Sequence, residues 1–165
     1  MPIRIVVTDA NILINLIHAQ ALELLGRLDG YEFVIVDQVE AEITRPEQAI
    51  ALRHAIDVAW LHRDAVNTIE GLSIFADLAR IMGRGEAACL ALAETRHWYV
   101  ASDEKKVFRR EALARLGQGR ILTTAGLIVM AIRANQLTID QADAIKLVLE
   151  TNRFRMAFAS FRDII

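Results

Sequence analysis

The sequence predicts an α/β fold in which a mainly parallel central sheet of four to five strands is flanked by helices on both faces. Short apolar runs rich in β-branched residues alternate with longer segments whose apolar residues recur at helical spacing. Because the short runs are almost continuously apolar, we expect strands that are covered on both sides. The chain has 165 residues and lacks repeats, low-complexity segments and linkers, which predicts a single domain over residues 1–165.

Four elements are predicted before the first proline-containing helix. They are a strand, a helix, a strand and a short helix: residues 3–8, 11–28, 33–36 and 37–45. The turn dipeptide Asp29-Gly30 ends the first helix. Asp37 and Glu40 have the spacing of a capping box that opens the short helix, which must end before Pro46.

The alternation continues through the rest of the chain. The predicted elements are helices at 47–60 and 69–82, a helix after residues 83–85, a strand at 98–101, a helix at 104–117, a strand at 120–122, and helices at 125–135 and 138–151. Glycines at positions 83 and 85 interrupt the pattern, and Gly117 ends the helix before it. The tail at 153–165 fits a helix or a strand, and we expect its Phe residues to pack onto the domain or onto a partner. The alternative is that these Phe residues and the Arg residues between them bind nucleic acid.

Composition excludes several classes of protein. The net charge of −2 argues against a polycation that grips nucleic acid by charge alone, and a single cysteine cannot form an internal disulfide. Apolar runs such as residues 87–93 are far shorter than the roughly 18 residues of a spanning helix. The apolar stretch at the N-terminus ends at Asp9, too early for a signal peptide. We therefore expect a cytoplasmic protein with no membrane association.

Two carboxylates follow predicted strands. Asp9 comes directly after the first strand, and Asp103 follows the strand at 98–101. Ligands of open parallel sheets gather beyond the carboxyl ends of the strands, and two carboxylates held together there call for a cation. Oxygen ligands favour Mg²⁺ or Mn²⁺. The alternative is that Asp9, and Asp103 or Ser102, merely cap the helices that follow them.

Two further acids, Glu42 and Glu86, have weaker local signals. Glu86 falls in the first turn after Gly83-Arg84-Gly85, where the helix dipole favours a carboxylate in any case. Asp37 also follows a strand, but the capping box gives it and Glu40 a local role, so both are left out of the site.

The combination resembles the PIN-domain family, the metal-dependent ribonuclease fold that includes VapC-type toxins. The matching segments, in the family's order, are VVTDANILINL with Asp9 and Asn11, VEAEI with Glu42, GRGEAACLALA with Glu86, ASDEKKVFRR with Asp103, and LTTAGLIVMA with Thr124. The resemblance runs from residue 3 to at least residue 135. It departs from the common pattern at Glu86, where many members have Asp.

The resemblance implies hydrolysis of RNA phosphodiester bonds with the help of Mg²⁺ or Mn²⁺. Asp9 and Asp103 are then expected to bind the metal directly, while Glu42 and Glu86 hold a second ion or orient the attacking water. Asn11 and Thr124 complete the expected catalytic set by positioning carboxylates or the phosphate. Glu104, adjacent to Asp103, is a further acid that contributes to this position as a secondary candidate.

Basic residues concentrate directly after Asp103. Six occur between positions 105 and 120, and Arg84 flanks Glu86 in a similar way. Arg84, Lys105, Lys106, Arg109 and Arg110 are the predicted RNA contacts, since phosphate contacts position a nucleic acid on a protein. The alternative is a solvated helix surface.

Partners follow from the resemblance alone. It implies a homodimer and the toxin of a toxin–antitoxin pair, neutralised by a small antitoxin. A catalytically silent PIN-like module that binds RNA or a protein is the alternative function. A phosphoacceptor receiver domain is disfavoured, because this sequence lacks the acidic pair and the late Lys that such a domain needs.

Cys89 is predicted to be a small core residue. The four histidines have no metal-ligand spacing and are assigned no role.

Overall fold

The computed structural model describes residues 2–165 and contains one five-stranded parallel sheet. The strands are β1 (Arg4–Thr8), β2 (Tyr31–Val36), β3 (His62–Asp64), β4 (Tyr99–Ala101) and β5 (Ile121–Leu122). Their spatial order is β3-β2-β1-β4-β5, and every neighbouring pair is parallel. The predicted α/β fold with a parallel sheet is confirmed.

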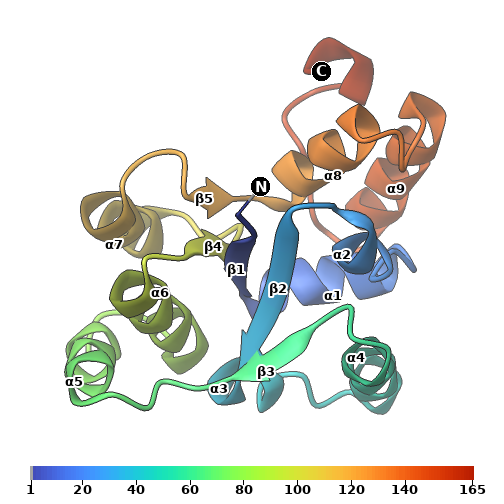
Figure 1. The fold of residues 1–165 in the computed structure, drawn as a ribbon. Helices are drawn as coiled ribbons and strands as arrows, with labels where there is room; N and C mark the ends of the chain where they lie inside the picture. The colour runs from blue at the N-terminus through green and yellow to red at the C-terminus, as the bar shows by residue number, and fades with distance from the viewer. Residues whose placement is uncertain (1) are drawn as a thin grey trace.

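Helices cover both faces of the sheet (Figure 1). They are α1 (Ala10–His18), α2 (Leu24–Arg27), α3 (Asp37–Glu40), α4 (Pro46–Asp57), α5 (Ile69–Leu78), α6 (Arg84–Arg96), α7 (Lys106–Leu116), α8 (Thr124–Arg133) and α9 (Ile139–Thr151). The helices α5, α6 and α7 lie on one side, and α1, α2, α4, α8 and α9 lie on the other. Among residues 2–165, no helix has the length and apolar character needed to cross a bilayer.

The single helix predicted at 11–28 is wrong, because the chain breaks it into α1 and α2. Gln20 adopts a left-handed φ of 52° directly after α1. The amides of Gln20 and Ala21 donate to the carbonyls of Ile17 and Leu16, at 3.0 and 2.8 Å. This is a Schellman ending, which usually carries Gly at the left-handed position. Because Gln occupies this position, the sequence carries no glycine signal for the end of α1.

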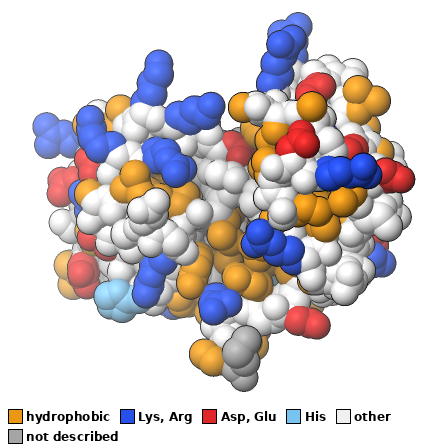
Figure 2. All heavy atoms as spheres, turned by 90° about the horizontal axis from the view of Figure 1, so that it is seen from above, with side chains coloured by type: hydrophobic (Ala, Val, Ile, Leu, Met, Phe, Trp, Pro, Cys, Tyr) orange, Lys and Arg blue, Asp and Glu red, His pale blue; other side chains and the backbone are white. Residues whose placement is uncertain are grey.

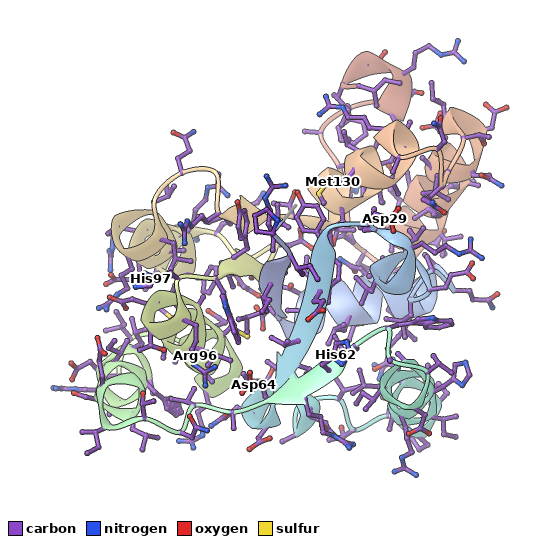
Figure 3. All side chains as sticks on the ribbon, viewed as in Figure 1. Asp29, His62, Asp64, Arg96, His97 and Met130 are labelled. Carbon is purple, nitrogen blue, oxygen red and sulfur yellow. The ribbon has the colours of Figure 1, made fainter. Side chains whose placement is uncertain are left out.

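The capping box predicted for Asp37 and Glu40 does not form. Val36 is the N-cap of α3 and makes no side-chain capping bond. Glu40 instead accepts two hydrogen bonds from the Arg63 guanidinium, at 2.9 and 3.0 Å. Arg63 belongs to β3, a short polar edge strand that the sequence pattern did not indicate, since its residues His-Arg-Asp lack the apolar signal of the other strands. Figure 3 shows His62 and Asp64 on this strand.

The tail after α9 packs onto the domain, which is one of the outcomes predicted from sequence. It is mostly irregular and ends with a 3₁₀ turn, η1 (Phe161–Asp163). Phe161 is fully buried against Ile128 of α8 and Leu149 of α9, in a cluster separate from the main core. Phe154 and Phe158 pack at the edge of the same cluster. The tail therefore closes a second, smaller core over α8 and α9.

Candidate active site

The carboxyl ends of all five parallel strands meet at one edge of the sheet. Because β2 lies on one side of β1 and β4 on the other, chain connections diverge between β1 and β4. Crevices at such points are where α/β sheets bind ligands. Asp9 follows β1 and Ser102 follows β4, and the Asp9 amide donates to the Ala101 carbonyl at 2.9 Å. The two strand ends are thus held together at the predicted position.

Asp9 is a buried carboxylate, with 3% of its surface exposed. It is the N-cap of α1, as the alternative interpretation required, and one carboxylate oxygen accepts from the Ala10 amide at 2.8 Å. The other oxygen accepts from the Ser102 hydroxyl at 2.9 Å. Burial raises the pKa of Asp9 to about 6, against the two hydrogen bonds, and the charges of Glu42 and Glu104 raise it further. Capping of α1 therefore explains the hydrogen bond from Ala10 to Asp9, but not the burial of Asp9 or its hydrogen bond from Ser102.

Helix α6 brings a second acid to the same edge. Its residues 87–93 are all buried, so this part of the helix lies in the core, and the Gly85 amide in its first turn donates to Glu42. Glu86, in that turn, is half-buried. Burial raises the pKa of Glu86 to about 7, and the charges of Glu104, Asp9 and Glu42 add to the effect in that order.

Glu42 reaches the N-terminus of α6 from the loop after α3. Its carboxylate accepts a hydrogen bond from the Gly85 amide at 3.1 Å. A Cβ at Gly85 would overlap this carboxylate, so the glycine is needed for the close approach. The backbone of α6 thereby holds Glu42 near Glu86 without any basic side chain.

Asp103 is held by a separate hydrogen-bond network. One of its oxygens accepts from the Thr124 amide at 2.9 Å, and the other accepts from the Thr124 hydroxyl and from Asn15 Nδ2 at 3.1 Å. Burial nevertheless raises the pKa of Asp103, and the charge of Glu104 adds to it. Asp103 does not cap α7, whose N-cap is Lys105. Thr124 is fully buried beside it.

Glu104, not Asp103, is the acid of this pair whose charge acts on Asp9 and Glu86. Asn11 connects the pair: its side-chain amide donates to Glu104 at 3.2 Å, and its oxygen accepts from the Asp103 backbone at 3.3 Å. Glu104 therefore has a larger place in this cluster than the secondary one expected from sequence. No three Asp, Glu, His or Cys side chains in residues 2–165 have the spacing of a metal centre.

Two positioning residues were missed by the sequence analysis. Asn15 is buried and donates to both Asp103 and Thr124, and Ser102 is buried and donates to Asp9. Asn15 had a detectable signal, since it is a polar residue in the apolar run LINLI, four positions after Asn11. Ser102 was considered only as a helix cap.

Comparison with known families fits this arrangement. The profile of the family designated DUF3368, described as a PIN domain, matches residues 5–165. The chain belongs to this PIN-domain family. A solved structure, the crystal structure of PAE2754 from Pyrobaculum aerophilum, is similar over 83% of this chain and all of that one, with 18% identity and a TM-score of 0.47. No curated protein matches the chain in sequence.

The basic residues of this PIN domain divide into two groups. Lys105, Lys106, Arg109 and Arg110 are exposed around the start of α7, close in sequence to Asp103. Arg115 is instead bound to Glu94 at 2.8 Å, and Arg120 donates to a backbone carbonyl, so these two have structural roles. Arg84, in the same turn as Glu86, lies over a Phe75 ring at 5.2 Å.

Cys89 and two of the histidines have structural surroundings of their own. Cys89 is fully buried in α6, as predicted. His97 caps the C-terminal end of α6, the opposite end from Glu86, as Figure 3 shows. His54 packs edge-on against Trp60, with ring centroids 5.3 Å apart.

Proposed function

We propose that this PIN domain is a divalent-metal-dependent endoribonuclease. The observation that carries the proposal is that the charges of Glu42 and Glu104 act on the buried Asp9, and that those of Glu104, Asp9 and Glu42 act on Glu86, at the edge of the sheet. None of the four forms an ion pair with a described residue. Carboxylates gathered without a basic partner are unfavourable unless a cation neutralises them.

The donor set fits Mg²⁺ or Mn²⁺, because all of its groups are carboxylates and hard cations prefer oxygen. Asp9, Glu42 and Glu86 would hold the ion, together with one acid of the Asp103–Glu104 pair. Glu104 is favoured, since its charge is among those that raise the pKa of both Asp9 and Glu86. A bound ion supplies an activated water and neutralises charge on the phosphoryl oxygens.

The other residues of the site orient these carboxylates. Ser102 and the Ala10 amide hold Asp9, while Asn15 and Thr124 hold Asp103. Asn11 keeps Glu104 turned toward the centre through its amide. The cations at positions 105, 106, 109 and 110 would bind phosphates of the substrate, with Arg84 on the other side of the acids.

The biological role is a further part of the proposal and rests on family resemblance. We infer that the protein is a cytoplasmic toxin, active as a homodimer, that residues 1–165 act as one domain, and that a small antitoxin neutralises it. A catalytically silent module that binds RNA or protein is the second candidate. It is favoured by one observation, that no three acids of residues 2–165 have metal-centre spacing.

Incubation of the purified protein with single-stranded and structured RNA separates these candidates. We expect cleavage with Mn²⁺ or Mg²⁺, none with EDTA, and none by Asp9→Asn, which keeps a side chain able to cap α1. The fold of the variant is checked by circular dichroism. Binding of RNA without cleavage under any divalent condition would favour the silent module, and full activity of Asp9→Asn would refute the assignment of the site.

A further inference from the structure

A pocket of about 330 Å³ adjoins the acids on the side of α7. One wall is formed by Ser102, Asp103 and Glu104, and a second by Lys105 and Arg109 at the start of α7. The opposite wall comes from the C-terminal tail, through Phe154 and Arg155. Its volume is in the range of small-ligand pockets, about 300–1,000 Å³. Segments separated by some fifty residues thus enclose one space beside the candidate site.

The first tail residues are held in this position by the end of α9. Arg153 is left-handed, with φ 68°, and its amide donates to the Glu150 carbonyl at 3.1 Å. The Phe154 amide donates to the Leu149 carbonyl at 2.9 Å, which completes a Schellman ending. This motif turns the chain back from α9 and directs Phe154 and Arg155 toward the pocket.

The far end of the tail is held independently. Asp143 of α9 accepts hydrogen bonds from the Ser160 hydroxyl and, at 2.8 Å, from the Phe161 amide. These bonds lower the pKa of Asp143. Since Phe161 is also buried, residues 154–160 are attached at both ends. The tail wall of the pocket is therefore a built part of the fold.

The charges of the pocket suit an anionic ligand. Lys105, Arg109 and Arg155 are exposed, and none of them makes an ion pair with another described residue. Three cations face two carboxylates, and the half-buried Phe154 adds an aromatic surface. Figure 2 shows many exposed Lys and Arg side chains on the face that it draws. A phosphate group and a stacked base match this combination of cations and aromatic surface.

We propose that this pocket binds one unpaired nucleotide of a single-stranded RNA, next to the phosphate that is cut. Lys105, Arg109 and Arg155 contact its phosphates, and its base stacks on Phe154. The proposal rests on the proposed ribonuclease function and adds a substrate subsite to it. It assigns the tail a role in substrate binding in addition to the packing that was expected from sequence.

Binding in EDTA tests the subsite without relying on cleavage. A fluorescein-labelled single-stranded RNA octamer is titrated with the full chain, by anisotropy, at several salt concentrations. We expect Arg155→Ala to weaken binding about fivefold or more and to reduce the slope of log K against log salt by about 0.7. Phe154→Leu keeps an apolar side chain for the small core and should cost about fivefold, through lost stacking.

Arg162→Ala is the matched control, because it removes an exposed tail arginine that does not line the pocket. It should leave affinity and salt slope unchanged, and thermal melts check that Phe154→Leu is folded. A duplex of the same sequence should bind more weakly, since its bases are not free to stack.

Unchanged RNA affinity in Arg155→Ala and Phe154→Leu would overturn the subsite, as would equal losses in Arg162→Ala. If Arg155→Ala abolished binding of a protein partner but left RNA affinity intact, the subsite would be overturned in favour of a protein-docking surface. If RNA binds with the predicted variant pattern but is never cleaved with Mn²⁺ or Mg²⁺, the subsite stands and the ribonuclease proposal fails.

Discussion

Both oxygens of the Asp103 carboxylate accept hydrogen bonds from Thr124, one from its backbone amide and one from its hydroxyl. The two residues are 21 positions apart and lie at the end of β4 and the start of α8. Asn15 of α1 donates to both. Three elements are thus joined at one point, and the side chain of the neighbouring Glu104 is exposed and accepts from Asn11 instead.

Thr124→Val tests this junction. Valine has nearly the same shape but leaves Asp103 and Asn15 without a buried hydroxyl partner. We expect the free energy of unfolding to fall by about 1–3 kcal/mol, the usual cost of an unsatisfied buried polar group. Urea denaturation measures the loss, and Thr124→Ser, which keeps the hydroxyl, should recover most of it. Equal stability of the Val variant and the wild type would contradict the network.

Glu86→Gln tests the metal assignment by a readout other than activity. Mn²⁺ that binds the folded protein stabilises it, by about 2.7 kcal/mol at a hundred times its dissociation constant. The melting temperature of the wild type should therefore rise with Mn²⁺, and that rise should be largely lost in Glu86→Gln.

Glu70→Gln is the control for Glu86→Gln, since Glu70 also lies in the first turn of a helix but is exposed on α5. It should keep the full response to Mn²⁺. The same response in both variants would remove Glu86 from the metal centre.

The raised pKa values of Asp9 and Glu86 predict a pH dependence of stability in EDTA. Their folded pKa values, about 6 and about 7, exceed those of unfolded carboxyl groups, about 4. The folded state therefore binds more protons, and the free energy of unfolding falls as pH rises from about 4 to 7. Asp9→Asn should be more stable than the wild type at pH 8 by about 3 kcal/mol, and equally stable below pH 4.

Urea denaturation at both pH values measures this difference. A deficit in stability of Asp9→Asn at pH 8 would show that the capping role outweighs the cost of burying the charge.

Gly85→Ala should separate stability from activity. Its Cβ would displace the Glu42 carboxylate, which lies at the far end of a flexible side chain, so the fold itself has little to lose. We expect stability within about 1 kcal/mol of wild type, because Ala favours the helix by about that amount. RNA cleavage should fall strongly. In a Glu42→Gln background the same change should have no further effect, and an equal effect in both backgrounds would exclude Glu42 as its target.

The parts of the fold that carried an apolar signal were predictable. The strands around Val6, Val34 and Val100 are short buried runs, and residues 87–93 of α6 are continuously apolar. Two features failed for local reasons. The break after α1 uses Gln20 where a glycine would be the visible signal, and β3 is too short and too polar to show alternation.

The site was predictable as a set of positions and not as a set of contacts. Acids after parallel strands must gather at one edge, which placed Asp9 and Asp103 from sequence. Which acid of the 103–104 pair faces the centre depends on Thr124 and Asn15, partners distant in sequence. The approach of Arg155 to Asp103 likewise depends on the turn that follows α9.

The most direct measurement is anomalous scattering from crystals grown with Mn²⁺. We predict a peak among the carboxylates of Asp9, Glu42, Glu86 and Glu104, with oxygen atoms about 2.0–2.2 Å away, and no such peak for Glu86→Gln. No peak at these acids, in crystals of protein that cleaves RNA with Mn²⁺ in solution, would contradict it.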